Sequence, residues 1–573
     1  MDFKKIRDNL SAYYETFILP GGYSYCEPET IKQIDAYYNS HFLTGDLDYQ
    51  GQRKPFYNIV KTPCDIGAKL IDFDRKDIII VPTVSNRLVD LNIALKQKKV
   101  KDEMKLTNFG QFINDLGELY PKYGHIYSLK TKDGWIKINI QNVRCHPGYE
   151  NINESPFVAI LSGMSKDDID EMGWNGADLN QLTGDKDYIV YQYLERHGKK
   201  WKRYFLTELY NRKSGSGMVE TPENQYLKGS DEYLPGLVLH EDEIKDFPLK
   251  EQKWDKIPGR HLGCGFVETL FPEQQEVNMV AYLRGKTLFL KALQLFFSKD
   301  ESIGNSVISD LEFGQIINTQ FDIQALPVNN ADISAYNDTF NTYIANAQKK
   351  TNSTDIASGD SLPSGTPLGS ARLQASFTVS YFNKKRENFA LFFKPIIYDM
   401  MKSAKVKKGD TLMFSRTDSE YDFVLEFVAE DMLNKEYAGR VADKEEYEAR
   451  RMEIEKQLKK KKNLAIEVDS DIDNNIESYV DVVITGEAID LNAKQQIYQF
   501  IISSVSANPG LLVSPTTRAM MFSLLRMAGE SPIALEAMSR RTETRPEQLP
   551  PGGGGQFNAT MPQAMAGNNV AEV

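Results

Sequence analysis

Residues Pro272–Ser298 run PEQQEVNMVAYLRGKTLFLKALQLFFS. A proline in the first turn with Glu273 beside it is a typical helix start, so the sequence predicts one helix of roughly 40 Å over this stretch. From Thr287 to Phe297 the residues are apolar on nearly every face of that helix. A helix that is apolar all round has to be buried all round, either in a large core or against neighbouring subunits.

The sequence after this helix predicts a hairpin-like excursion from the body of the protein. A short β-like stretch at Gly304–Leu326 ends at Pro327, and capping residues at 329–332 begin a second helix over 331–350. Apolar residues of the second helix recur at helical spacing and form one stripe, which consists of Ile333, Tyr336, Phe340, Tyr343, Ile344 and Ala347. Two helices therefore flank a small β unit.

The next segment, 351–369, is polar and rich in Gly, Ser and Pro, as is typical of a loop. By composition alone it fits an ordinary surface linker as well as a loop with a special role. A third long helix is predicted over Ser370–Ala404, and Pro395 inside it is expected to kink or break it.

The regions before and after these three helices are predicted to contain both strands and helices. Turn-forming residues in 1–270 separate five strand candidates, which are Asp77–Val81, Trp135–Ile140, Phe157–Leu161, Tyr188–Leu194 and Trp201–Leu206. Towards the C-terminus we expect a charged helix at 440–463, a strand at Tyr479–Thr485, helices at about 490–506, 515–528 and 531–540, and a disordered tail from Thr542. The charged helix fits a solvated face or a contact with DNA or an acidic partner.

Composition narrows the classes of function. At 573 residues, two or more packed regions are expected, and 41% hydrophobic residues are enough to build their cores. The sequence contains no run of about 18 apolar residues, so no membrane-spanning helix is expected. The first residues also lack the apolar run of a signal peptide. A net charge of −12 argues against a protein that grips nucleic acid by neutralising phosphates, but not against one through which DNA slides.

Catalytic and metal-binding motifs are missing from the sequence. It has no P-loop, no G-x-S-x-G and no H-E-x-x-H, and Gly263-x-Gly265 is only a fragment of a dinucleotide-binding pattern. The four cysteines are dispersed and the adjacent Cys145 and His146 have no second pair, so free thiols are expected. We therefore predict no catalytic residues, no metal, no cofactor and no enzymatic activity.

The order of features resembles that of tailed-bacteriophage portal proteins over most of residues 30–540. Gln52–Val60 (QRKPFYNIV), followed by Asp65-Ile66-Gly67 and a strand up to Pro82, is similar to the early portal segment, where an Asn-bearing start leads into a helix and then a strand. Gly263–Asn278 (GCGFVETLFPEQQEVN) resembles the entry to the first stem helix, where Gln and Asn precede a long helix. The segment with Ser364-Gly365-Thr366-Pro367-Leu368 lies where portals have the tunnel loop.

The resemblance implies an α+β fold of the portal type. Its parts would be a mixed α/β wing at 1–270, stem helix 1 at 271–299, a small β-containing clip at 300–330, stem helix 2 at 331–350, the tunnel loop at 351–369, a second wing portion with a long kinked helix at 370–485, a helical crown at 486–541 and a disordered tail at 542–573.

The resemblance also implies a function. The protein would form a ring, typically of twelve subunits, at one capsid vertex in the virion, after assembly in the host cytoplasm, and genomic DNA would be packaged and ejected through it. Its partners would be the terminase large subunit, head–tail adaptor proteins, major capsid and scaffolding proteins, and double-stranded DNA contacted without sequence specificity, with no membrane involved.

The resemblance assigns site residues as well. Those expected to face DNA at the tunnel loop are Lys349, Lys350, Ser353, Ser358, Ser361, Ser364 and Thr366. Those expected to contact neighbouring subunits in the stem are Leu288, Leu290, Leu293, Phe296, Phe297, Tyr336, Phe340 and Tyr343.

The residues themselves agree with such an assembly. An isolated subunit would expose the apolar part of the first stem helix as a large patch, whereas a closed ring buries it through repeated contacts between unlike faces. The same features also fit two alternatives: another large virion or assembly protein, such as a minor capsid or baseplate component, and an uncharacterised hydrolase with acidic catalysis.

Overall fold

The computed structural model describes most of the chain, with short gaps inside the ranges 3–208, 235–292, 333–353, 368–437, 444–468 and 480–484, and with Phe296–Phe297, Gln324–Ala325, Gln499 and Ser503 in addition. The chain divides into two compact units. The first contains Met1–Asp410 and Val468–Ala488, and the second contains Thr411–Glu467 and Ile489–Val573. Helices and several small sheets alternate, which confirms the predicted mixed α+β class.

The largest sheet lies in the first unit and is antiparallel throughout, with strand order β10-β9-β8-β7-β6. Successive residues of a strand point to opposite faces. In β8, Tyr191 packs with helix α1 (Phe3–Ala12) on one face, and Val190 packs with Ile169 of α6 (Lys166–Glu171) on the other. The bounds of the strands are β6 Val143–Cys145, β7 Phe157–Met164, β8 Tyr188–His197, β9 Lys200–Glu208 and β10 Pro235–Ile244.

All five strands predicted in the N-terminal region are present, with ends shifted by a few residues. Two of them are β3 (Ile78–Pro82) and β5 (Gly134–Ile138), and the other three are β7, β8 and β9. The predicted strand Tyr479–Thr485 is also found, as β16 (Val480–Ile484), and it pairs antiparallel with β3. A three-stranded sheet of order β11-β4-β5 includes two strands that the sequence did not predict, β4 (His125–Thr131) and β11 (Leu249–Lys253).

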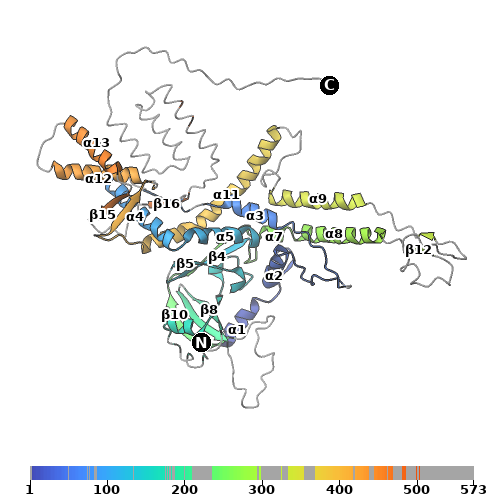
Figure 1. The fold of residues 1–573 in the computed structure, drawn as a ribbon. Coiled ribbons are helices and arrows are strands. Elements are labelled where there is room, and N and C mark those ends of the chain that lie inside the picture. The colour runs from blue at the N-terminus through green and yellow to red at the C-terminus, as the bar shows by residue number, and fades with distance from the viewer. Residues whose placement is uncertain are drawn as a thin grey trace, which may run out of the picture. The chain divides into compact units, whose positions relative to one another are not determined.

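Helices of the first unit lie beside this small sheet, with α5 next to β4 and β5 (Figure 1). They pack around aromatic residues: Phe389 of α11 stacks on Tyr120 of α5 with 5.4 Å between ring centroids and meets Phe73 edge to face at 5.6 Å. Aromatic pairs in such geometries add stability beyond the area that they bury. The helices concerned are α2 Glu27–Tyr38, α3 Lys61–Ile71, α4 Arg87–Leu106, α5 Phe109–Tyr123, α7 Phe266–Thr269 and α11 Leu368–Ser403.

Helix α11 agrees with the predicted third helix, but it begins at Leu368, inside the predicted loop, and Pro395 does not break it. A proline inside a helix costs about 3 kcal/mol because a hydrogen bond is lost and the ring clashes with the preceding turn. The residues around Pro395 offset that cost by packing, since Phe392, Phe393, Ile396 and Ile397 are all buried.

The predicted hairpin-like excursion is present in part. Its first helix, α8 (Phe271–Ala292), ends six residues before the predicted end at Ser298, and Phe296–Phe297 forms a strand, β12, that pairs with β13 (Gln324–Ala325). The expectation that 287–297 is one apolar helical stretch was therefore wrong: the two phenylalanines follow the helix end and pair in a ladder. The second helix is α9 (Ile333–Thr351), close to the predicted 331–350.

The described part of the second unit is a helical pair with a two-stranded sheet. Its elements are β14 Thr411–Ser415, α12 Tyr421–Glu436, α13 Lys444–Lys460 and β15 Asn463–Glu467. Helix α13 is the predicted charged helix, but it is not purely a solvated face, because Ile454 and Leu458 are buried and Arg451 pairs with the buried Glu426 of α12. The predicted crown and tail lie outside the described residues, apart from Gln499 and Ser503.

Among the helices that the structure describes, none is both long and apolar enough to cross a membrane.

A close approach of backbones joins α5 and β4 to the segment that precedes α7. Gly124, between α5 and β4, has φ +71°, and a Cβ placed on it would lie 2.2 Å from the carbonyl carbon of Cys264 and the nitrogen of Gly265. A Cβ on Gly263 would lie 2.1 Å from the oxygen of Gly124. Gly263-x-Gly265 is therefore explained by packing, since only glycine leaves room for a second backbone.

We expect Gly124→Ala to lower the free energy of unfolding by about 2–5 kcal/mol, because overpacking adds about 1–3 kcal/mol to the strain of about 1–2 kcal/mol of a left-handed alanine. Gly198→Ala is the matched control, since Gly198 has φ +64° with nothing within 4 Å of its added Cβ. The control should lose only about 1–2 kcal/mol. Denaturant unfolding of both variants measures the difference, and equal losses would contradict the proposed contact.

Candidate functional site: a helical arm and its anchor

Helices α8 and α9 lie side by side and run in opposite directions (Figure 1). Lys350 at the end of α9 pairs with Glu273 at the start of α8, with 2.5 Å between Nζ and Oε1. Further along, Arg284 of α8 donates a hydrogen bond to Asn337 of α9 at 3.0 Å. We call α8 and α9 together the arm.

The arm exposes apolar side chains of α8. Val277 and Val280 near its start are buried, whereas Met279 is 56% exposed, Leu283 41% and Leu288 45%. Met279 and Leu283 are one turn apart and share a face of the helix. Leu288 follows Met279 by about two and a half turns and therefore lies on the opposite side. The arm thus presents apolar groups on two sides.

The stripe on α9 is used differently. Tyr336, Phe340 and Tyr343 are half-buried, and Phe340 meets Tyr57 of the same chain edge to face, with 4.7 Å between ring centroids. The sequence assigned these three residues to contacts between subunits. In the structure, Phe340 contacts Tyr57 of its own chain, so this part of the apolar stripe on α9 is already covered.

A set of amide hydrogen bonds anchors the arm. The side chain of Gln274 donates to the carbonyl of Tyr57 at 2.7 Å and accepts from the N–H of Ile59 at 2.9 Å. Asn278, one turn later, accepts from the N–H of Tyr57 at 2.9 Å. Both amides are buried, so they need hydrogen-bond partners inside the protein and find them on this backbone segment. The first turns of α8 are thereby clamped to residues 57–59.

Asn58, between the clamped residues, holds the same segment from the other side. Its side-chain nitrogen donates to the carbonyls of Tyr37 and Tyr38, at 3.2 and 3.0 Å, at the end of α2. Its oxygen accepts from the N–H groups of Val60 and Lys61 at the start of α3. Segments 52–60 and 263–278, two of those singled out in the sequence, therefore meet here.

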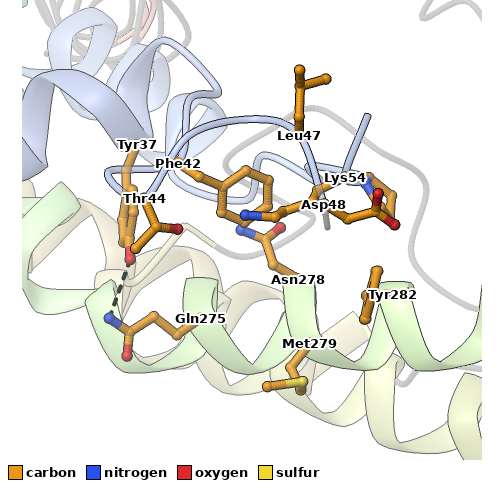
Figure 2. Close-up of a pocket in the computed structure, with 11 residues that line it drawn as sticks. Tyr37, Phe42, Thr44, Leu47, Asp48, Lys54, Gln275, Asn278, Met279 and Tyr282 are labelled. Atoms are coloured by element: carbon orange, nitrogen blue, oxygen red, sulfur yellow. Dashed lines mark hydrogen bonds between the residues drawn. The ribbon is translucent and has the colours of Figure 1, made fainter. Parts of the chain in front are cut away.

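A pocket of about 510 Å³ lies beside this anchor. Figure 2 shows its walls: the loop after α2 on one side and the first turns of α8 on the other, with Tyr37 and Gln275 joined by a hydrogen bond of 3.1 Å. Its lining residues are Tyr37, Phe42, Thr44, Leu47, Asp48, Lys54, Pro55, Gln275, Asn278, Met279 and Tyr282. Met279 therefore belongs both to the pocket and to the exposed face of α8.

Local hydrogen bonds fix the loop that forms the outer wall. Asp46 accepts from the N–H of Phe42 at 2.9 Å and contacts the ring nitrogen of His41 at 2.8 Å, and both interactions hold the pKa of its carboxyl below the ordinary value. Lys54 donates to the carbonyl of Gly45 at 2.9 Å. Leu43 and Leu47 are exposed on this loop, so the apolar surface of the arm continues onto it.

The predicted DNA-facing residues have different environments. Lys349 is exposed, but Lys350 is engaged with Glu273 inside the arm. Ser353 is buried, and its hydroxyl lies 2.6 Å from that of Thr351, so the structure contradicts its assignment to an exposed loop. Ser358, Ser361, Ser364 and Thr366 lie outside the described residues.

The predicted stem contacts are also only partly described. Leu288 is exposed on α8, as is required of a residue expected to contact a neighbouring subunit. Leu293 lies outside the described residues, and the side chains of Leu290, Phe296 and Phe297 are not described either. Sequence reasoning missed Met279, Leu283, Leu43 and Leu47, and its only signal for them was the apolar spacing of 279 and 283 along the helix.

A scan against protein-family models finds no match to this sequence, and a search of curated proteins finds no similar protein. What the chain does is therefore inferred from its own residues.

We expect Gln274→Ala to destabilise the chain by about 1–3 kcal/mol, because the change removes a fully buried amide and its hydrogen bonds to the carbonyl of Tyr57 and the N–H of Ile59. Gln275→Ala is the control. The Gln275 side chain is exposed and donates a hydrogen bond to Tyr37, so this substitution should lower the stability by less than about 1 kcal/mol. Thermal unfolding measures both. Equal stability of the two variants would show that the clamp is unimportant.

Proposed function

We propose that the chain is the subunit of a portal ring at one capsid vertex of a tailed bacteriophage, through which genomic DNA is packaged and ejected. In this proposal the arm is the stem of the portal, β12 and β13 belong to the clip, and α11 is the long helix of the wing. Twelve copies would close the ring. The role is structural, and the chain itself contributes no chemistry.

The observation that carries the proposal is the position of apolar side chains on opposite sides of α8. A subunit of a closed ring meets one neighbour with one face and the next neighbour with a different face. Met279 and Leu283 would serve one contact and Leu288 the other. A partner that binds only one side of the arm would leave the second set exposed to water, at a cost of about 25 cal/mol for each Å² of apolar surface.

The anchor supports the same role. Packaging motors exert force on DNA, so the helices that line the channel have to keep their orientation under mechanical load. The start of α8 is tied to residues 57–59 by buried amides, and α9 is tied to α8 by the pair of Lys350 and Glu273. Buried hydrogen bonds of this kind fix one geometry.

Contacts with DNA would be weak and independent of base sequence. The chain carries 80 acidic and 68 basic residues, so it is not built to hold the phosphate backbone tightly. Lys349 is exposed at the end of α9 and would approach phosphate at the edge of the proposed tunnel loop. Terminase, head–tail adaptors, capsid and scaffolding proteins would bind the assembled ring.

The test is assembly of variants with charge on the arm. Leu283→Asp and Leu288→Asp should each abolish ring formation, because a carboxylate would be buried at the contact between subunits. Both residues are exposed in the single chain, so its fold should be unaffected. Size-exclusion chromatography with light scattering, followed by negative-stain microscopy, measures the outcome.

Leu106→Asp is the matched control, since Leu106 is 85% exposed at the end of α4, away from the arm in sequence. It should form rings like the original chain. Rings from both arm variants, or an original chain that stays monomeric at high concentration, would refute the proposal.

The tunnel loop gives a second test. Deletion of 354–366 should leave rings intact and reduce the amount of DNA packaged or retained, because the loop would act on DNA inside the channel and not on subunit contacts. A chain in which a Gly-Ser segment of equal length replaces the loop separates loss of length from loss of sequence. Normal packaging by the deletion variant would exclude the tunnel-loop role.

A further inference from the structure

Three potential ligand side chains converge in the interior of the first unit, apart from the arm. His125 is the first residue of β4, Glu251 lies on the paired strand β11, and His261 lies on the segment between β11 and α7. Both histidines are fully buried, and the side chain of Glu251 is 13% exposed. One potential ligand atom from each side chain lies within 4.8 Å of the other two.

Two of the three distances between the potential ligand atoms are close to those of a tetrahedral metal site. The carboxylate Oε2 of Glu251 lies 3.0 Å from Nε2 of His125 and 3.7 Å from Nε2 of His261. Ligands about 2.0–2.1 Å from a zinc ion at tetrahedral angles are separated by about 3.3 Å. The two distances bracket this value. We propose that His125, Glu251 and His261 bind one Zn²⁺ ion, or a similar first-row divalent ion, that stabilises the fold of the first unit.

The chemistry of the donors supports zinc. Two imidazoles and one carboxylate form a familiar protein set for this ion, and calcium or magnesium would require more oxygen donors. The hydroxyl of Tyr127 lies 2.7 Å from Nε2 of His261 and 3.3 Å from Nδ1 of His125. The hydroxyl therefore flanks Nε2 of His261, one of the three potential ligand atoms.

Neighbouring groups already orient the ligands. The N–H of Ile152 donates to Oε1 of Glu251 at 2.9 Å, which turns the other carboxylate oxygen towards the histidines. The segment that carries His261 is held against β4 by the close contact between Gly124 and Gly263–Gly265. Outer groups that fix the first ligands raise metal affinity because less freedom is lost on binding.

Local charges are balanced for a cation. Arg260, next to His261, is neutralised by two hydrogen bonds of 2.7 Å to Glu268. Lys253 and Arg144 are further cations in the same interior, and the buried Glu27 is a further carboxyl there.

The test is the metal content of the full chain. After unfolding with a chelator and refolding with a small excess of Zn²⁺, the dialysed chain should retain one ion, as measured by inductively coupled plasma mass spectrometry. Refolding with Co²⁺ should give the visible absorption band of a tetrahedral site. Absence of both the retained zinc and the cobalt band would overturn the proposal.

Variants identify the ligands. His261→Gln and Glu251→Gln should each lower zinc affinity at least tenfold and weaken or remove the cobalt band. His197→Gln is the matched control, since His197 also lies 3.3 Å from a glutamate, Glu195, but is half exposed at the end of β8. The control should keep full affinity. Equal affinity of all three variants would place the ion elsewhere and overturn the assignment.

If the ligand variants fail to fold, a milder substitution still tests the site. Tyr127→Phe removes one hydroxyl and keeps the buried ring, and it should shift the cobalt band while the chain still folds. An unchanged band would exclude Tyr127 from the site. Ring assembly plays no part in these measurements, so they stay informative even if the chain forms no ring.

Discussion

The contact between the backbone of Gly124 and that of Gly263–Gly265 is the constraint on which the other features of the first unit depend. It presses the segment before α7 against the junction of α5 and β4. One consequence is that α7 and α8 leave the body next to α3, where Gln274 and Asn278 reach residues 57–59. Another is that His261 comes to lie beside His125 and Glu251.

The arm combines two kinds of interaction with different roles. Buried amides and one ion pair fix its start, because polar groups that water cannot reach have to find partners and do so in only one geometry. Apolar side chains farther along remain exposed and are not directional. An arm that is held firmly at its start and exposes apolar side chains farther along is suited to the proposed contacts between subunits. The pocket beside Met279 extends this apolar surface onto the loop after α2.

Local patterns predicted much of the fold. Strands β7, β8 and β9 are rich in aromatic and β-branched residues, and the helix starts at Pro272 and near Asp332 follow capping chemistry. Strand β11, LKEQK, was missed because its residues are mostly polar, and it is a strand only through its pairing with β4. The end of α8 was misplaced because apolar residues continue from 287 to 297 and periodicity cannot separate a helix from a strand there.

By itself, the sequence determined the mixed class, several strands of the N-terminal region and the apolar spacing of the arm, because these follow from backbone preferences and from which residues avoid water. It also contained the segments 52–60 and 263–278, but not the reason that both occur. Only the tertiary structure decided that they clamp each other, that Lys350 pairs with Glu273 and that Ser353 is buried. Contacts between residues some two hundred positions apart depend on how the elements pack, and no local pattern encodes that.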